Sequence, residues 1–174
     1  MKNQARLIRK AKQNEVEAVF LVISKSAAWL AQQGFDNWKR YSRATVDQLV
    51  KSNELYVLVE DNLIIGTIQI SKYSPSFFQK EDLARWNDSK AQAIYFTALA
   101  ILPKHHGNRY GLELIRYAEQ VAFDHGINYL RMTMNAQNAN LKRYYEKLGF
   151  VFRQERWVSK VSLNLAFGEK QISI

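Results

Sequence analysis

The chain has 174 residues and no cysteine, and its 25 Lys and Arg against 16 Asp and Glu give a formal net charge of +9. The lack of cysteine excludes disulfides, thiol nucleophiles and zinc thiolate sites, and it suits a reducing compartment such as the cytoplasm. A chain of this length can bury a full core without crosslinks, and no linker interrupts it, so we expect one domain over residues 1–174. The positive charge favours an anionic ligand or partner.

The first half of the chain predicts a strand, two helices and a hairpin. Apolar side chains at steps of three and four indicate the first helix, which Gly34 ends. Thr45 is a candidate N-cap for the second helix, and Asp61-Asn62 is the expected turn of the hairpin. The expected bounds are 5–8 for the first strand, 14–32 and 45–52 for the helices, and 55–60 and 63–71 for the hairpin strands.

The second half predicts a central strand at 93–101, closed by Pro103, and an amphipathic helix that Gly126 ends. A strand follows this helix, and such a crossover implies that the two strands are parallel. Residues 73–90 show no regular pattern. The other expected elements are helices at 111–125 and 138–148 and strands at 129–134, 150–157 and 161–167, which together make an α/β fold with a mixed sheet.

The turn between the central strand and the helix at 111 is a candidate phosphate cradle. The N–H groups at a helix start have no acceptor within the helix and lie at the positive end of its dipole, so they can hold a diphosphate. Lys104, His105 and Arg109 add positive charge. The turn matches neither GxGxxG nor GxxxxGK[ST]. An ordinary strand-to-helix loop with solvated charges is the alternative.

Two motifs resemble those of the GNAT superfamily of N-acetyltransferases. The turn His106-Gly107-Asn108-Arg109-Tyr110-Gly111 resembles the [Q/R]xxGx[G/A] acyl-CoA loop, with Arg109 at a usual glycine, and Asn138 with residues 145–150 resembles NxxxxxxYexlGF. If Arg109 had to be left-handed, it would cost about 1 to 2 kcal/mol, so we expect Gly107 and Asn108 to make the turn. The resemblance implies a single-domain, mostly antiparallel mixed sheet of six to seven strands with about four helices, splayed at the acyl-CoA site.

The resemblance also implies acetyl-CoA as co-substrate and transfer of its acetyl group to a primary amine in a ternary complex. Main-chain groups of the central strand would pair with the pantetheine arm, and those of the turn would hold the pyrophosphate. Asn138 would bond the cofactor or cap its helix. The implied cofactor-binding residues are Leu99, Ala100, Ile101, His106, Gly107, Asn108, Arg109, Tyr110, Gly111, Asn138 and Tyr145.

Tyr145 is the candidate catalytic residue, as the general acid that protonates the CoA thiolate. A phenol with a pKa near 10 can donate to a thiolate whose thiol has a pKa of about 8.5 with a small uphill step. The alternative is that Tyr145 only packs in the core. No base is assigned, because the central strand has no Asp or Glu, and solvent is the default. Polar groups that remain as candidates are Tyr95, Thr97, Glu81, Asp82 and Asp88.

Several aromatic residues fall where related proteins form the acceptor pocket, or else they cover the core. They are Trp29, Phe35, Trp38, Tyr73 and Trp86. The three histidines lack ligand spacing, so no metal is expected. The acceptor would be a small-molecule or peptide amine, and strands near the C-terminus suit a homodimer. No signal peptide or membrane helix is expected, because the longest apolar run ends at Pro103, short of about 20 residues.

Two other functions fit parts of the sequence. A non-catalytic acyl-CoA-binding module would fit Arg109 in the loop and the missing carboxylate on the central strand. A basic nucleic-acid-binding domain would fit the net charge of +9 and the basic residues near the start of the chain, but no helix-turn-helix, zinc-finger or RNP-type motif accompanies them, so the sequence disfavours it. Those basic residues are Arg6, Arg9, Lys10 and Lys12.

Overall fold

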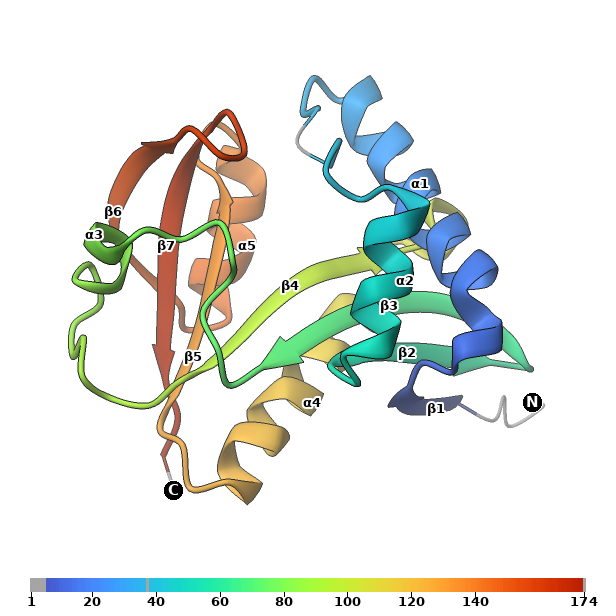
Figure 1. Ribbon diagram of the computed structural model, residues 1–174, viewed down its shortest axis with the longest axis horizontal. Coiled ribbons are helices and arrows are strands. Elements are labelled where there is room, and N and C mark those ends of the chain that lie inside the picture. Colours follow the sequence, from blue (N-terminus) through green and yellow to red (C-terminus); the bar gives the residue numbers. More distant parts are fainter. Residues whose placement is uncertain (1–5, 37, 174) are drawn as a thin grey trace. The chain divides into compact units, whose positions relative to one another are not determined.

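The computed structural model describes residues 6–36 and 38–173, and their contacts divide them into two compact units. Unit 1 comprises the described residues up to Ile70 together with residues 98–117, and unit 2 comprises residues 71–97 and 118–173. The seven strands follow the order β1-β2-β3-β4-β5-β7-β6 (Figure 1). Strand β4 (Ile94–Ile101) and helix α4 (Tyr110–Asp124) each contribute to both units.

Unit 1 contains an antiparallel sheet formed by β1 (Arg6–Lys10), β2 (Leu55–Glu60) and β3 (Leu63–Ser71). The hairpin of β2 and β3 has the predicted bounds. Its turn residues Asp61 and Asn62 have φ of 49° and 66°, the left-handed values that a tight two-residue hairpin requires. Ala5, the first residue of the expected strand 5–8, lies outside the described residues, and the strand itself continues to Lys10 because it pairs with β2 throughout.

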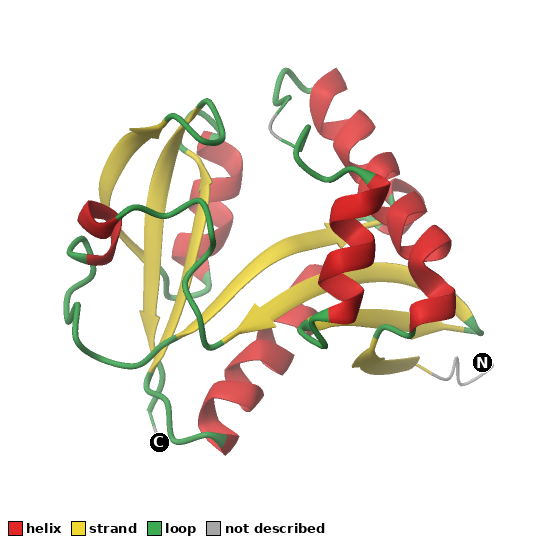
Figure 2. Ribbon diagram, viewed as in Figure 1, coloured by secondary structure: helices red, strands yellow, loops and turns green. Residues whose placement is uncertain are grey.

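Helices α1 (Val16–Gln32) and α2 (Arg43–Lys51) pack over one face of this sheet, as Figure 2 shows. A short 3-10 turn, η1 (Gln13–Glu15), leads into α1. The predicted cap of α2 is wrong: Ser42 is the N-cap, and its hydroxyl accepts from the N–H of Thr45 at 3.2 Å. The buried core between helices and sheet includes Val19, Val22, Ile23, Val46, Leu55, Val57, Ala98 and Ala100.

Unit 2 contains the antiparallel strands β5 (Tyr129–Asn135), β7 (Leu163–Gln171) and β6 (Val151–Val158). The first residues of β4 pair with β5 in parallel register, Ile94 with Leu130 and Tyr95 with Arg131, which confirms the predicted crossover. Strand β7 runs four residues beyond the expected end at 167, because it pairs with β5 as far as Gln171.

Unit 2 also holds helices α5 (Ala139–Lys147) and α3 (Lys80–Leu83). The irregular pattern at 73–90 gave no sign of α3. It forms because Asp82 is fully buried, accepts from the N–H of Gln79 at 2.7 Å and binds Arg156 of β6. With α3 the described part of the chain has five α-helices, one more than expected. None of the helices in residues 6–36 and 38–173 has the length and apolar character to cross a membrane.

Candidate active site

The second half of β4 directs one row of its main-chain groups away from β3. The N–H of Leu102 donates to the carbonyl of Ile65 on β3 at 2.9 Å. Successive residues of a strand direct their main-chain groups to opposite edges. The N–H and C=O groups of Leu99 and Ile101 therefore face the edge away from β3. These are the two residues predicted to pair with a pantetheine arm.

Two backbone features shape this part of β4. Ala98 has φ of 50°, which interrupts the extended strand, and the hydroxyl of Thr67 donates to its carbonyl at 2.9 Å. Gly66 of β3 leaves space for the side chain of Ile101, because a Cβ at position 66 would lie 2.6 Å from Ile101 Cδ1. Ile101 can therefore lie flat against β3, toward Leu114 of α4.

The carbonyl of Ile101 already has two donors. The hydroxyl of Ser26 on α1 donates to it at 2.9 Å, and Nε2 of His106 lies at the same distance. Because a carbonyl only accepts, Nε2 must carry the proton in this contact. The ring of Trp29 meets the His106 ring edge-on, with centroids 4.6 Å apart. The side chain of His106, predicted to bind the cofactor, thus folds back onto the end of β4.

The turn into α4 uses two left-handed residues. Gly107 has φ of 85° and Arg109 has φ of 61°, whereas Asn108 is not left-handed. The expectation that Gly107 and Asn108 would share the turn is therefore correct for Gly107 and wrong for Asn108. Asn108 instead donates from its side chain to the carbonyl of His105 at 3.2 Å. Helix α4 begins directly after Arg109, at Tyr110.

The start of α4 presents free main-chain donors. The first hydrogen bond of the helix runs from the N–H of Glu113 to the carbonyl of Arg109 at 3.1 Å. The N–H groups of Tyr110, Gly111 and Leu112 precede it and have no acceptor within the helix. The helix dipole adds partial positive charge at this end, and Arg109 adds a full one. The predicted loop therefore has the donors that an anionic group requires.

Tyr110 is held by Glu60, a residue that no sequence motif indicates. Its hydroxyl donates to the buried carboxylate of Glu60 on β2 at 2.6 Å. This hydrogen bond, together with burial, raises the pKa of Tyr110 above its usual value of 10.0. The pair is separated by 50 residues in the chain, so no local pattern could have signalled it.

In unit 2, Asn138 and Tyr145 have distinct environments. Asn138 is the N-cap of α5, and its side-chain oxygen accepts from the N–H of Leu141 at 3.0 Å. Tyr145 is 4% exposed and lies against the rings of Phe96 and Phe150, at centroid distances of 6.2 and 5.5 Å. Desolvation by burial raises its pKa well above 10, so the phenol stays protonated at neutral pH.

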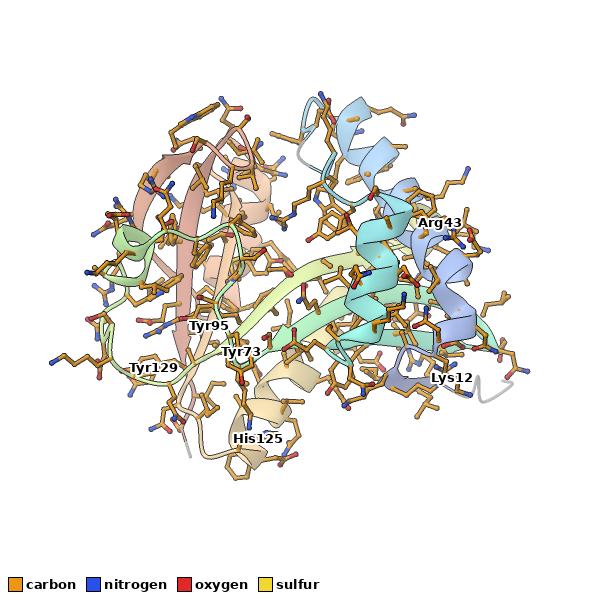
Figure 3. The ribbon with its side chains drawn as sticks, viewed as in Figure 1. Lys12, Arg43, Tyr73, Tyr95, His125 and Tyr129 are labelled. Atoms are coloured by element: carbon orange, nitrogen blue, oxygen red, sulfur yellow. The ribbon has the colours of Figure 1, made fainter. Side chains whose placement is uncertain are left out.

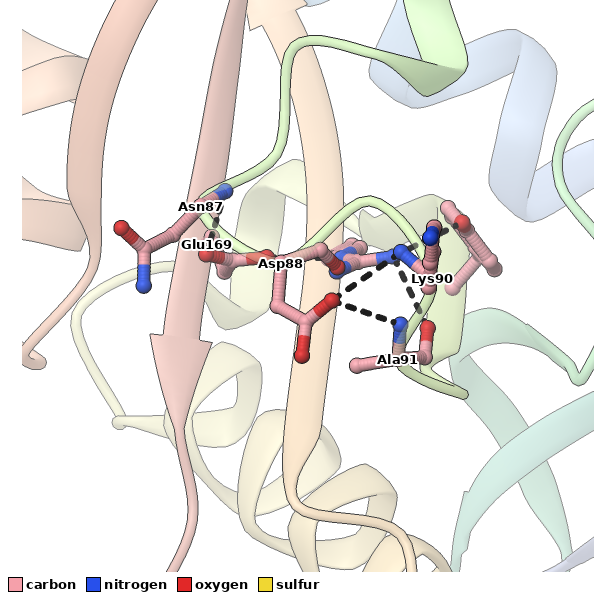
Figure 4. A network of polar contacts seen from close by, with 7 residues as sticks. Asn87, Asp88, Lys90, Ala91 and Glu169 are labelled. Atoms are coloured by element: carbon pink, nitrogen blue, oxygen red, sulfur yellow. Dashed lines mark hydrogen bonds and ion pairs between the residues drawn. The ribbon is translucent and has the colours of Figure 1, made fainter.

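Two of the three carboxylates that are candidates for a remote base have structural partners. Asp82 binds Arg156 through both oxygens. Asp88 accepts from the N–H groups of Lys90 and Ala91, each at 3.1 Å, within the network of Figure 4. Glu81 is exposed on α3. Asp82 and Asp88 are thus engaged by hydrogen-bond donors, and solvent surrounds Glu81.

Arg131 of β5 is the centre of a buried polar network in unit 2. It is 1% exposed and donates to Glu169 at 2.7 Å, and to the hydroxyl of Tyr95 at 3.3 Å. Glu169 also accepts from the N–H of Asn87 (Figure 4). Tyr95, another polar group of β4 that was considered, is thereby tied into the core of unit 2.

The five aromatic residues considered for an acceptor pocket separate into different roles. Trp86 is 5% exposed and belongs to the core of unit 2. Tyr73, which Figure 3 labels, follows β3 and is 78% exposed. In unit 1, Trp38 lies 5.1 Å from the ring of Tyr41 and packs on the core. Trp29 remains half-exposed beside the loop. Phe35 is half-buried in the segment after α1.

Unit 1 brings together the predicted strand and loop residues, from Leu99 to Gly111, and adds Ser26 and Glu60 to them. Asn138 and Tyr145 belong to unit 2. Within residues 6–36 and 38–173, no three His, Asp or Glu side chains form a group that could hold a metal ion.

Comparison with protein families gives one match. The model of the acetyltransferase (GNAT) family matches residues 23–150. This range includes β4, the loop, α4 and the motif at Tyr145. Comparison of the sequence with curated proteins gives no match.

Solved structures share the fold. A GNAT-family acetyltransferase from Listeria monocytogenes has a TM-score of 0.77 at 17% identity, covering 98% of this chain and 100% of the other. The PaiA N-acetyltransferase of Thermoplasma acidophilum, solved in complex with coenzyme A, has a TM-score of 0.73 at 18% identity and covers 96% and 99%. The ribosomal-protein-S18-alanine N-acetyltransferase of Escherichia coli has 0.70 at 14%, with 98% and 96% covered. At these identities the likeness concerns the fold.

Proposed function

This chain belongs to the acetyltransferase (GNAT) family, whose acyl donor is acetyl-CoA, and we propose that it transfers the acetyl group to a primary amine by direct attack in a ternary complex. The observation that carries the proposal is the arrangement in unit 1. A row of main-chain groups on β4 that faces away from β3 leads into a turn, and the first N–H groups of the helix that follows have no acceptor within that helix.

For the donor, we assign the pyrophosphate to the loop and the pantetheine arm to β4. The N–H groups of Tyr110, Gly111 and Leu112 suit the pyrophosphate, and Arg109 adds charge. The main-chain groups of Leu99 and Ile101 suit the amides of pantetheine. Since the Ile101 carbonyl is held by Ser26 and His106, its N–H is the group we assign to the donor. Asn138 would act through the start of α5, which it caps.

The chemistry needs no acylated residue. The lone pair of the neutral amine attacks the thioester carbonyl carbon, and the C–N bond forms. As the tetrahedral intermediate collapses, nitrogen releases a proton to water, the C=O bond re-forms, and the C–S bond breaks with its electron pair on sulfur. We assign to Tyr145 the proton that the thiolate takes up. Its raised pKa makes the proton transfer more uphill, but it also ensures that the phenol is protonated when the thiolate forms.

The ammonium proton of the acceptor has to leave before or during attack. Because Asp82 and Asp88 are engaged in hydrogen bonds, we assign this step to water. An amine with a depressed pKa would need little assistance. This assignment predicts that activity rises with pH as the acceptor loses its proton.

The remaining assignments are also proposals. We take residues 1–174 as one catalytic domain, because β4 and α4 each belong to both units. We propose a small-molecule or peptide amine as acceptor, the cytoplasm as location and a homodimer as assembly. The S18-alanine N-acetyltransferase, which has the same fold, acts on a protein, so a peptide acceptor is among those to test.

The first experiment is thermal unfolding with acetyl-CoA, CoA or ATP. A ligand at 100 times its dissociation constant stabilises the native state by about 2.7 kcal/mol, which is a shift of several degrees. We expect a shift with acetyl-CoA and CoA but not with ATP, followed by thiol release in a screen of amines. Binding without turnover on any amine would favour the non-catalytic module, and no shift at saturating CoA would refute the proposal.

A further inference from the structure

Glu60, at the end of β2, is a buried carboxylate that the proposed chemistry does not use. It is 6% exposed. Its Oε1 accepts from the hydroxyl of Tyr110 at 2.6 Å, and its Oε2 lies 3.7 Å from Nδ1 of His105. These two residues stand on either side of residues 106–109. One carboxylate therefore contacts both ends of the turn that leads into α4.

A buried carboxylate at this place lowers the stability of the protein unless polar partners compensate its charge. Burying a charge is costly, and a negative group beneath a proposed diphosphate site opposes the ligand. The two carboxylate oxygens of Glu60 face the hydroxyl of Tyr110 and Nδ1 of His105. Arg6, whose guanidinium lies 5.4 Å from the centroid of the Tyr110 ring and 3.6 Å from Glu113, adds a positive charge on the same side. All of these residues belong to unit 1.

The turn between the two anchored residues is strained. Gly107 and Arg109 are both left-handed, and for Arg109 this conformation is unfavourable. Such conformations persist only where surrounding contacts determine them. Tyr110 is hydrogen-bonded to Glu60 and His105 lies beside the same carboxylate, so residues 106–109 must close the gap between two residues that contact one group. The N–H groups at the start of α4 then keep one direction before any ligand arrives.

We propose that Glu60 is a positioning residue for the acyl donor: through its hydrogen bond to Tyr110 and its contact with His105 it fixes the turn at 106–109 for the pyrophosphate of acetyl-CoA. The inference rests on the proposed function, which places the pyrophosphate at this loop. Glu60 itself touches no reacting atom. Its loss should weaken donor binding and leave the chemical step unchanged.

The test compares CoA affinity by isothermal titration calorimetry in the wild type and four variants. Glu60→Ala and Tyr110→Phe each remove the hydrogen bond, and we expect the Kd for CoA to rise about tenfold. Glu60→Gln keeps an oxygen that can accept from Tyr110 and should show a smaller rise. Glu15→Gln is the matched control, because Glu15 is a carboxylate of the same unit that accepts from Arg9 and from the N–H of Lys12 rather than from a residue of the loop. It should bind CoA as the wild type does.

A second measurement separates positioning from general destabilisation. With an amine from the screen, Glu60→Ala should raise the KM for acetyl-CoA while kcat stays unchanged. With S-acetylpantetheine, which lacks the pyrophosphate, kcat/KM should be the same in the wild type and the variant. If the role of Glu60 were purely structural, Glu60→Ala would lower kcat/KM for both acyl donors by the same factor. The double variant Glu60→Ala with Tyr110→Phe should be no weaker than either single variant, because both remove one interaction.

The outcomes distinguish the two proposals. If the wild type binds no CoA, the proposed function fails and the inference falls with it. If the wild type binds CoA and Tyr110→Phe and Glu60→Gln bind it equally well, only the inference is refuted. Should Glu60→Ala not fold, as judged by circular dichroism, Tyr110→Phe decides the question because it removes a single oxygen atom.

Discussion

Arg156 of β6 donates from Nε and from one terminal nitrogen to the two carboxylate oxygens of Asp82, each at 2.7 Å. Asp82 is fully buried, and its hydrogen bond raises the pKa of Arg156 above its ordinary value. The pair joins two segments that are 74 residues apart. It holds the loop between β3 and β4 on β6, within unit 2.

Disrupting the pair of Asp82 and Arg156 should lower the stability of the protein and leave its turnover unchanged. Asp82→Asn removes the charge that faces Arg156 and should lower the free energy of unfolding by about 2 to 3 kcal/mol. Chemical denaturation measures that change. Turnover per folded molecule, measured well below the melting temperature, should be unchanged, because Asp82 is not assigned as a base. A selective loss of kcat with full stability would return Asp82 to the catalytic candidates.

The left-handed conformation of Arg109 predicts a difference in stability between two variants that both remove its charge. Arg109→Gly relieves the strained conformation, whereas Arg109→Ala retains it. We expect the glycine variant to be more stable than the alanine variant by about 1 kcal/mol in urea unfolding, after the greater freedom of glycine in the unfolded chain is included. Equal stabilities would contradict a positive φ at this position.

The sequence predicts most of the strands closely because each has a strong local signal. The hairpin of β2 and β3 is bounded by Asp61-Asn62, and β4 is a β-branched and aromatic run before Pro103. Helix α3 has no such signal. It is four residues long, too short for a periodic pattern, and Arg156 from a distant strand holds it in place.

The same distinction applies to the candidate site. The loop from His106 to Gly111 is contiguous in sequence, so its motif could be recognised. Ser26 and Glu60 could not be, because they are 75 and 50 residues from Ile101 and Tyr110, the residues that they contact. Only the packing of α1 and β2 in unit 1 brings these groups to the loop.

Close approach between β3 and β4 predicts a compensating pair of substitutions. Gly66→Ala places a Cβ 2.6 Å from Ile101 Cδ1 and 3.2 Å from the carbonyl oxygen of Ala100. We expect it to destabilise the protein by about 1 to 2 kcal/mol. Ile101→Val removes the Cδ1 atom, so the double variant should regain part of this loss relative to the sum of the two single variants. Thermal unfolding of all four proteins gives the coupling, and strict additivity would contradict the contact.

Tyr145 and its neighbour Tyr144 form a natural pair for testing the general acid. Tyr145 is 4% exposed, whereas Tyr144 is 37% exposed. Tyr145→Phe should lower kcat about 100-fold and leave the Kd for CoA nearly unchanged, because the lost proton donor acts only as the thiolate leaves. Tyr144→Phe is the control and should keep both values.

The pH dependence follows from the same burial. Desolvation raises the pKa of Tyr145 well above its ordinary value of 10.0, so the phenol keeps its proton across the range in which the acceptor amine loses its own. In the wild type, kcat should therefore rise with pH and then level, without a descending limb up to about pH 10. A pH series of initial rates with saturating acetyl-CoA measures this profile. A fall in kcat between about pH 8 and 9, absent from Tyr145→Phe, would require a phenol with a lowered pKa and would contradict the buried position of Tyr145.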